Sequence, residues 1–243
     1  MEFSMRRVNA LFKKEIKDFG KNVNVSLMCL LPIVFSIIYS KLFGGNAVED
    51  HLGKTDILIM CIGMNLIMVS GFVVAMLIAE EKEKNTLRTL MLSGVSPLEF
   101  LTGKILITFL ISQIINVAIF FIIGISIQYL GIYILLTTLV VFTMIEIGAL
   151  IGIISPNQMS TGVVGMPVLM LFLMVPLFAK LNKTLLKIAE FLPNYNMNLM
   201  LEKLFKGEII GLGYAYNIAV ILVWIIIAGA AFAYTYNKVG LDK

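Results

Sequence analysis

The sequence predicts an all-α membrane protein with six transmembrane helices. Hydrophobic residues make up 59% of its 243 positions and charged residues only 14%, and the mean hydropathy is +0.96. Soluble domains rarely exceed about half apolar residues. The apolar stretches are separated by polar or charged segments, and most are long enough to cross a hydrocarbon core of about 30 Å at about 1.5 Å per residue. Without a repeat or a linker, residues 1–243 are expected to form a single domain.

The spans differ in length and in how they are connected. They are expected at residues 23–43, 57–79, 105–129, 132–154, 162–179 and 214–236. Only Leu130 and Gly131 separate the third span from the fourth, which predicts a tight antiparallel hairpin. The fifth span is short and contains Pro167 and Pro176, so its length is marginal for a full crossing.

Residues 1–22 are basic and amphipathic. One helical stripe is apolar but is interrupted by Glu15, and Lys and Arg residues lie on the other side. The apolar stripe consists of Met5, Val8, Leu11, Phe12, Ile16 and Phe19. This pattern predicts a helix that lies in the membrane interface with its lysines among the lipid headgroups. The alternative is a basic tail that only fixes the orientation of the chain.

Basic residues predict the orientation of the spans. If both termini are cytoplasmic, the inner segments carry twelve Lys and Arg residues and the outer segments carry seven. Lys and Arg are enriched in cytoplasmic loops, so this distribution favours cytoplasmic termini.

Residues 80–104 form the one internal segment that is charged and amphipathic. Residues 80–84 are all charged, and Leu87, Leu90 and Met91 then follow with the spacing of one helical face. Gly94 is a plausible helix end, and residues 96–99, Ser-Pro-Leu-Glu, have the form of a capping box that opens the next helix. We expect a short interfacial helix of about two to three turns, with an ordinary polar loop as the alternative.

This segment resembles the cytoplasmic coupling segment of permease subunits of type-2 ATP-binding-cassette (ABC) exporters. The matching positions are Glu81, Glu83, Thr86, Leu87, Leu90, Val95, Ser96, Glu99, Phe100, Leu101, Gly103 and Lys104. The chain departs from the family pattern at Asn85, where the family usually has Gly, and at Gly94, where it often has Pro. Asn and Gly both tolerate turn conformations, so a loop remains compatible with these departures.

The resemblance implies a partner and a set of contact residues. Leu87, Leu90 and Met91 would dock into a groove of a cytoplasmic ABC ATPase, next to Thr86, and Glu81, Glu83 and Arg88 would fix the register by charge. The ATPase would be a separate chain that binds ATP and Mg, so this chain would carry no cofactor itself. A second permease copy or a paralogue would complete a dimer.

Residues 180–213 are expected to form an outer region before the last span. Two apolar stripes fall in this segment, Pro193 and Asn194 separate them, and Gly207 ends the second. We expect two short amphipathic helices that lie on the outer leaflet or dip into it. The segment resembles the outer region before the last span in the same exporter family.

The sequence lacks the motifs of several other functions. It contains no phosphate loop of the form GxxxxGK[ST] and no HExxH zinc motif, and its single histidine is His51 in a loop, so we expect no enzymatic activity. Cys29 and Cys61 lie in apolar runs without metal-ligand spacing. The net charge of +4 is modest and its basic residues lie at the ends of the spans, which argues against nucleic-acid binding.

Polar residues within the spans are candidates for a transport path. Glu146 lies in the middle of the fourth span, where a charge costs roughly 3 kcal/mol or more. It is either a conduit or gating residue, or a structural contact to Gln113 or Asn116 of the third span. Asn65, Gln113 and Asn116 either line a path or join helices. Gly148 and Gly152 form a GxxxG motif, which permits close helix packing.

The pattern and the resemblance together predict a transport subunit. We expect an exporter of an amphipathic or hydrophobic substrate, such as a peptide toxin, an antimicrobial peptide or a drug, in contact with the lipids of a bacterial plasma membrane. An ion-coupled secondary transporter and a partner-free membrane scaffold are the alternatives. Secondary transporters tend to show inverted repeats and several buried charges, whereas this chain has no repeat and one buried Glu.

Overall fold

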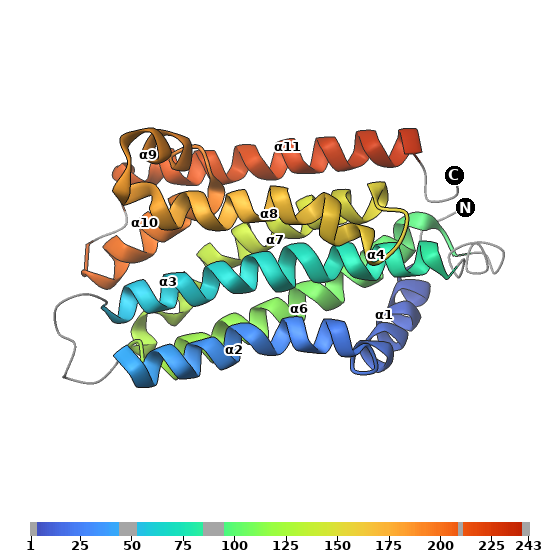
Figure 1. Ribbon diagram of the computed structural model, residues 1–243, viewed down its shortest axis with the longest axis horizontal. Coiled ribbons are helices and arrows are strands. Elements are labelled where there is room, and N and C mark those ends of the chain that lie inside the picture. The colour runs from blue at the N-terminus through green and yellow to red at the C-terminus, as the bar shows by residue number, and fades with distance from the viewer. Residues whose placement is uncertain (1–3, 44–52, 85–94, 209–210, 240–243) are drawn as a thin grey trace.

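The protein is a bundle of helices that run along one long axis (Figure 1). The computed structural model describes residues 4–43, 53–84, 95–208 and 211–239, and all regular structure within them is helical. In chain order the elements are α1 (Met5–Phe19), α2 (Val23–Phe43), α3 (Lys54–Asn65), η1 (Leu66–Val73), α4 (Val74–Glu83), α6 (Pro97–Ile123), η2 (Ile127–Tyr129), α7 (Leu130–Ile154), α8 (Ser160–Phe178), η3 (Ala179–Leu181), α9 (Lys183–Ala189), α10 (Pro193–Phe205), η4 (Leu212–Tyr214) and α11 (Ala215–Val239).

Six stretches of the described residues are long and apolar enough to cross a membrane. They are Val23–Phe43, Lys54–Glu83, Leu98–Ile123, Ile127–Ile154, Ser160–Leu181 and Ala215–Tyr236. The prediction of an all-α protein with six spans is therefore confirmed. The end of α11 lies at the end of the bundle that carries α1, as an even number of crossings requires (Figure 1).

The second span is longer than expected and is not a uniform α-helix. α3, η1 and α4 follow one another without a break over residues 54–83, and η1 is a π-helix. A π-helix has a wider turn than an α-helix and is often found at functional positions. No local pattern predicts this π-helix, because residues 66–73 are apolar throughout apart from Ser70 and Gly71.

The predicted hairpin between the third and fourth spans was placed too late in the chain. α6 ends at Ile123, and Gly124 follows in the left-handed conformation with φ of +74°. A glycine in this conformation is a common helix end because it has no Cβ to clash. The turn therefore lies at residues 124–129, and Leu130 and Gly131 already belong to α7. The apolar residues around Gly124 hid this stop in the sequence.

Two glycines of α7 allow it to lie very close to the second span. A Cβ atom at Gly148 would be 2.1 Å from the carbonyl oxygen of Gly71, and one at Gly152 would be 2.9 Å from that of Ala75. Both distances are too short for a side chain. The GxxxG motif thus serves close helix packing within one chain.

The end of the bundle opposite α1 is closed by short helices. Two short helices, α9 and α10, lie between residues 180 and 213, and Gly207 follows α10 with φ of +80°. The expected placement of these helices at an outer leaflet stays a prediction. The Nδ2 of Asn196 donates to the carbonyl oxygens of Glu190 and Leu192, each at 2.8 Å, and the Nδ2 of Asn217 donates to the Oδ1 of Asn196 at 2.8 Å. These hydrogen bonds fix the turn between α9 and α10 against α11.

The apolar stripe of α10 packs against protein. Met197, Met200, Leu201 and Leu204 are buried, and α10 contacts α3, α7, α8 and α11. The stripe therefore anchors α10 to the bundle. Whether its outer side also meets a lipid leaflet stays a prediction.

We predict that Gly148→Ala lowers the stability of the protein. The added methyl group meets backbone at Gly71, which cannot rotate away, and overpacking of this kind costs about 1–3 kcal/mol. The midpoint of thermal unfolding in detergent should fall by about 5 °C. Gly131→Ala, in the same helix, is the matched control, because a Cβ atom there meets nothing within 4 Å. Equal midpoints for the two variants would contradict the close packing of α7.

Candidate functional site at the charged junction of α1, α4 and α6

The predicted coupling residues are only partly within the described structure. Glu81 and Glu83 lie in the last turn of α4. Thr86, Leu87, Arg88, Leu90 and Met91 lie outside the described residues, so the expected coupling helix stays a prediction. The structure does describe both flanks of residues 85–94, namely the end of α4 and the start of α6.

The start of α6 has the predicted capping box. The Oγ of Ser96 accepts a hydrogen bond from the backbone N–H of Glu99 at 3.2 Å, and the Oε2 of Glu99 accepts one from the N–H of Ser96 at 2.8 Å. Pro97 occupies the first turn of the helix, where a missing N–H is tolerated. This pair of hydrogen bonds fixes where α6 begins.

Glu99 also holds the start of α1. Its Oε1 accepts from the backbone N–H of Ser4 at 2.6 Å, and its two oxygens accept from the Nε of Arg7 at 3.0 and 2.9 Å. The Nη2 of Arg7 lies 2.9 Å from Oε1. Glu99 is fully buried, and the hydrogen bond to it raises the pKa of Arg7. The sequence predicted the capping role of Glu99 but not this contact with α1.

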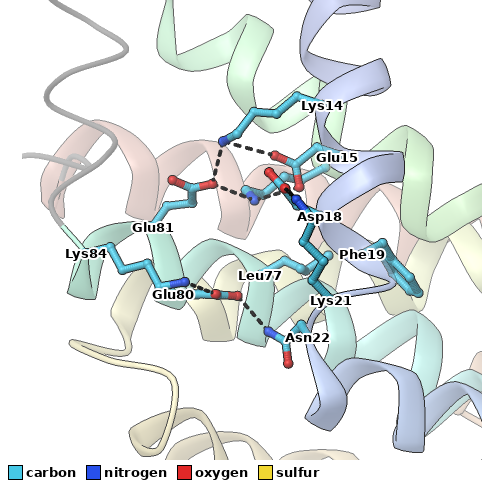
Figure 2. Close-up of a pocket in the computed structure, with 11 residues that line it drawn as sticks. Lys14, Glu15, Asp18, Phe19, Lys21, Asn22, Leu77, Glu80, Glu81 and Lys84 are labelled. Carbon is cyan, nitrogen blue, oxygen red and sulfur yellow. Dashed lines mark hydrogen bonds and ion pairs between the residues drawn. The ribbon is translucent and has the colours of Figure 1, made fainter.

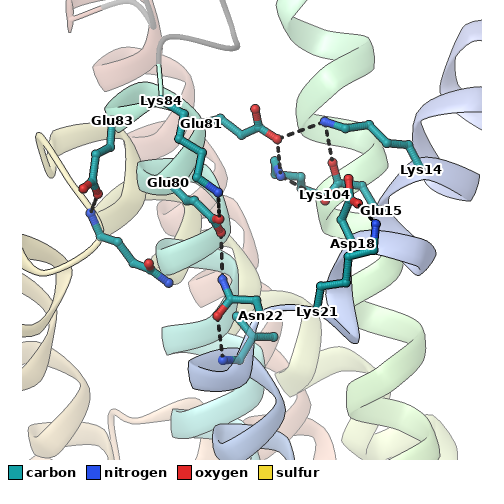
Figure 3. Close-up of polar contacts among 12 residues, drawn as sticks. Lys14, Glu15, Asp18, Lys21, Asn22, Glu80, Glu81, Glu83, Lys84 and Lys104 are labelled. Carbon is teal, nitrogen blue, oxygen red and sulfur yellow. Dashed lines mark hydrogen bonds and ion pairs between the residues drawn. The ribbon is translucent and has the colours of Figure 1, made fainter.

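Farther along α6, a buried lysine joins three helices. The Nζ of Lys104 donates to the Oε2 of Glu15 on α1 at 2.9 Å and to the Oε1 of Glu81 on α4 at 3.2 Å. The Nζ of Lys14 donates to the same oxygen of Glu81 at 3.2 Å and lies 3.8 Å from the Oε1 of Glu15 (Figure 3). Two lysines and two glutamates leave the cluster neutral, which suits a site where the Lys104 side chain is only 3% exposed.

The carboxylates of the cluster stabilise the charged form of Lys14. Partial burial lowers the pKa of Lys14, but the carboxylates of Glu81 and Glu15 raise it more, so it lies above its ordinary value. Lys14 therefore stays charged at neutral pH. Its stabilising contribution is present at neutral pH and is lost only as the pH rises through this raised pKa.

The buried face of α1 differs from the predicted stripe. Val8, Leu11 and Glu15 are buried, whereas Met5 is 72% and Ile16 is 50% exposed. Glu15, which seemed to interrupt the apolar stripe, is in fact at the centre of the contact. The helix also lies close to α6, because a Cβ atom at Gly103 would be 3.2 Å from the Cβ of Leu11.

The last turn of α4 contacts several other elements. Glu80 pairs with Lys84 and accepts from the Nδ2 of Asn22, just before α2, at 2.8 Å. The Nζ of Lys82 donates to the carbonyl oxygens of Ile153 and Ser155 at the end of α7, at 2.6 and 2.9 Å. A cation at this place satisfies the free carbonyls of a helix C-terminus.

Glu83 extends these contacts to the connection between α7 and α8. Its Oε2 accepts from the backbone N–H of Gln158 at 2.9 Å (Figure 3). The four charged residues 80–83 therefore touch α1, α6, α7, the residue before α2 and the connection between α7 and α8. We call this set of contacts, together with those of Lys104 and Lys14, the charged junction.

A cavity opens beside the charged junction. Its volume is about 350 Å³, and it lies between α1 and α4 (Figure 2). Phe19 and Leu77 provide apolar wall, and the remaining lining residues are charged or polar. All eight charged side chains of the lining take part in the ion pairs described here or in the pair of Lys21 with Asp18.

Two of the polar residues predicted within the spans are brought together. The Nδ2 of Asn65 donates to the Oδ1 of Asn116 at 2.7 Å and to the Oγ of Ser112 at 3.1 Å, and Ser112 shares a hydrogen bond of 2.7 Å with Ser70. All four side chains are buried. They join the second span to α6 where η1 begins, as the helix-joining interpretation expects.

Glu146 and Gln113 do not belong to this polar cluster. The Oε1 of Glu146 would lie 3.0 Å from a Cβ at Gly229, so the carboxyl group faces α11. Neither amide atom of Gln113 has a hydrogen-bond partner among the described residues, and the same holds for the Oε2 of Glu146. The expected contact between Glu146 and Gln113 or Asn116 was therefore wrong, because the carboxyl group of Glu146 faces α11 and not α6.

A comparison with known protein families identifies the family of the chain. A model of the family described as ABC-2 family transporter protein matches residues 49–232. The chain belongs to the ABC-2 transporter family. No curated protein sequence matches the chain significantly.

For an ABC-2 transporter, the extent of this match is informative. It begins after α1 and α2, includes the second to fifth spans with the whole segment 80–104, and ends within α11. Glu81 and Lys104 therefore lie within the part of the chain that the family model matches. The participation of Arg7, Lys14 and Glu15 rests on the contacts of the structure alone.

We predict that Lys104→Met strongly destabilises the bundle. The substitution removes one of the two lysines that pair with the buried Glu15 and Glu81, and removal of one partner from a buried ion pair costs about 3 kcal/mol. Thermal unfolding in detergent measures the effect. Lys21→Met removes the exposed pair with Asp18 and should change the midpoint little. Adding Glu15→Gln to Lys104→Met should recover part of the loss, and no recovery would contradict a charge effect.

We also predict that Glu99→Gln loosens α1 without unfolding the bundle. A neutral amide cannot accept from Arg7, Ser4 and Ser96 at once, so the start of α1 loses its attachment. Amide hydrogen exchange of residues 4–19 should become faster by tenfold or more, an effect of about 1.4 kcal/mol. Glu190→Gln, at an exposed position, is the control. Unchanged exchange in α1 would show that Glu99 does not hold it.

Proposed function

We propose that the chain is the transmembrane subunit of an ATP-driven exporter. A separate cytoplasmic ABC ATPase would bind and hydrolyse ATP with Mg, and two permease subunits, identical or paralogous, would form the path. The family match supports the permease role. The absence of a phosphate-loop motif from the sequence supports a separate ATPase chain.

The observation that carries this proposal is the charged junction. Residues 85–94 connect α4 to α6, and both flanks are tied to α1 by Glu81, Lys104 and Glu99. A force applied to residues 85–94 would therefore act on three helices together. This is what a coupling segment needs if closure of an ATPase pair is to tilt the spans.

The contact with the ATPase would be formed by the segment itself. In this proposal Leu87, Leu90 and Met91 enter a groove of the ATPase, while Glu81, Glu83 and Arg88 set the register. Glu81 and Glu83 already have partners within the chain, at Lys104 and Gln158. Their role in coupling would then be mainly to transmit the movement of the segment, with the apolar residues supplying the contact.

The orientation and the location follow from the same proposal. The end that carries α1 and both termini would face the cytoplasm of a bacterial cell, in agreement with the distribution of Lys and Arg. α9 and α10 would then lie at the outer face.

The proposed substrate is amphipathic or hydrophobic. A small apolar cavity of about 50 Å³ lies between α2, the second span and α8, and five of its nine lining residues are methionines. They are Met28, Met64, Met68, Met166 and Met170. Flexible, polarizable methionine side chains adapt to apolar groups of varied shape. This lining supports a peptide toxin, an antimicrobial peptide or a drug over a strongly charged substrate.

An ion-coupled secondary transporter is the second candidate function. It is favoured by Glu146, whose Oε2 is buried without a hydrogen-bond partner among the described residues. Ionisable residues within spans often mark ion or proton paths. In that case transport would depend on Glu146 and not on an ATPase.

We predict that Leu87→Asp with Leu90→Asp abolishes ATPase binding and transport. Two charges on the apolar face would prevent its insertion into a hydrophobic groove. The chain would be co-expressed with the ABC ATPase encoded nearest to it in the source genome and purified in mild detergent. The wild type should retain the ATPase, and the variant should lose it while still reaching the membrane.

The control is a second variant that carries two added negative charges on the opposite face of the expected helix. Asn85→Asp with Thr89→Asp places two charges about 100–160° around a helix from Leu87 and Leu90, and this variant should keep the ATPase. Loss of binding in both variants would indicate a nonspecific effect. A well-folded wild type that binds no ATPase, but whose transport is lost in Glu146→Gln, would favour the ion-coupled alternative.

A further inference from the structure

Two adjoining cavities lie at the end of the bundle opposite the charged junction. The larger, of about 180 Å³, and the smaller, of about 40 Å³, lie between α3, α8 and α10. They share the lining residues Ile59, Met60, Pro176, Leu177 and Asn198. We call this combined space the far cavity. Neither Glu81 nor Glu83, the two coupling residues within the described ranges, lines it.

The outer part of the far cavity is acidic. Asp56, Glu202 and Lys180 line it, and the Nζ of Lys180 lies 3.0 Å from the Oε1 of Glu202. That ion pair leaves the carboxylate of Asp56 as the excess charge among the described lining residues. The Oδ2 of Asp56 accepts a hydrogen bond from the backbone N–H of Gly53 at 3.1 Å, so Oδ1 is the oxygen open to a ligand. Asp56 and Glu202 are both partly buried, so their attraction for a cation is stronger than at a fully solvated surface.

The inner part of the far cavity contains an unused hydrogen-bond acceptor. Asn194 lines it and is only 3% exposed. Its Nδ2 donates to the carbonyl oxygen of Phe172, while its Oδ1 has no partner among the described residues. A buried acceptor without a donor is costly, and a ligand or a bound water would relieve that cost.

The wall shared by the two parts of the far cavity is apolar except for Asn198. Ile59, Pro176 and Leu177 form part of it. Asp56 and Gly63, which line opposite parts of the cavity, are seven positions apart along one helix, a rise of about 10 Å. The far cavity thus offers a negative end, an apolar middle and an acceptor end over that length.

We propose that the far cavity binds an amphipathic amine, with its ammonium group at Asp56 and Glu202 and a hydrogen-bond donor at the Oδ1 of Asn194. An apolar body of one ring or a short chain fits between the two ends. The site is independent of the proposed export function, because this binding requires neither ATP nor a second subunit.

Substitutions of Lys180 and Asp56 should change the affinity for the amine in opposite directions. Its ammonium group competes for Glu202, so its removal frees a second carboxylate for the ligand. Lys180→Met should therefore bind the amine more tightly, whereas Asp56→Asn should bind it more weakly. A variant that merely damages the fold would weaken binding in both cases.

Tyramine is a suitable probe, because it carries an ammonium group and a phenolic hydroxyl at opposite ends of a ring. Its binding to the full chain in lipid nanodiscs would be measured by calorimetry without ATP or ATPase, with empty nanodiscs subtracted. Phenethylamine lacks the hydroxyl group and 4-ethylphenol lacks the ammonium group. Tyramine should bind about threefold to tenfold more tightly than phenethylamine, the effect of one hydrogen bond.

The variants complete the test. Asp56→Asn should weaken tyramine and phenethylamine about fivefold and leave 4-ethylphenol unchanged, and Lys180→Met should tighten both amines about threefold. Equal affinities for tyramine and phenethylamine would overturn the role of Asn194 and would indicate that water, and not the ligand, donates to its Oδ1. Equal effects of Asp56→Asn on all three probes, or weaker amine binding by Lys180→Met, would overturn the ammonium site.

Discussion

The ammonium group of Lys104 constrains the arrangement of the helices around it. A charge with 3% exposure at the end of a membrane bundle is tolerated only if opposite charges reach it, and these come from Glu15 of α1 and Glu81 of α4. Arg7 with Glu99 and the close approach of Leu11 to Gly103 add two further points of contact. The three contacts follow the same order along both helices, so α1 runs beside α6 in the same sense. α1 is therefore attached as part of the bundle, through the half-buried Arg7 near its start and the buried Glu15 near its end.

The last turn of α4 shows how a fully charged sequence can lie inside a structure. Successive residues of a helix point about 100° apart, so residues 80–83 cover its whole circumference. A run of this kind usually indicates a solvated helix end. Here each side chain has a partner on a different element: Asn22 for Glu80, Lys104 for Glu81, the end of α7 for Lys82, and Gln158 for Glu83. The charges thus organise the junction and do not merely end a span.

Features determined by neighbouring residues could be predicted from the sequence, and features determined by distant partners could not. The spans follow from apolar length, and the capping box of Ser96 and Glu99 follows from a spacing of three residues. The burial of Glu15 depends on Lys104, 89 positions away, and so it looked like an interruption. Glu146 was assigned to the wrong neighbour for the same reason. The π-helix and the turn at Gly124 were missed because apolar residues surround both and hide local signals.

The second span links the two ends of the molecule. It carries Glu81 at the charged junction, Asn65 and Ser70 at the centre, and Asp56 at the far cavity. At the centre it is hydrogen-bonded to α6 through Ser112 and Asn116, and at the junction it is bonded to α6 again through Lys104. The two helices on either side of residues 85–94 are therefore fastened to each other at two levels. A displacement of that segment would therefore move the two helices as a pair. The wider turn of η1, where the backbone departs from regular α-helical geometry, lies next to the central attachment.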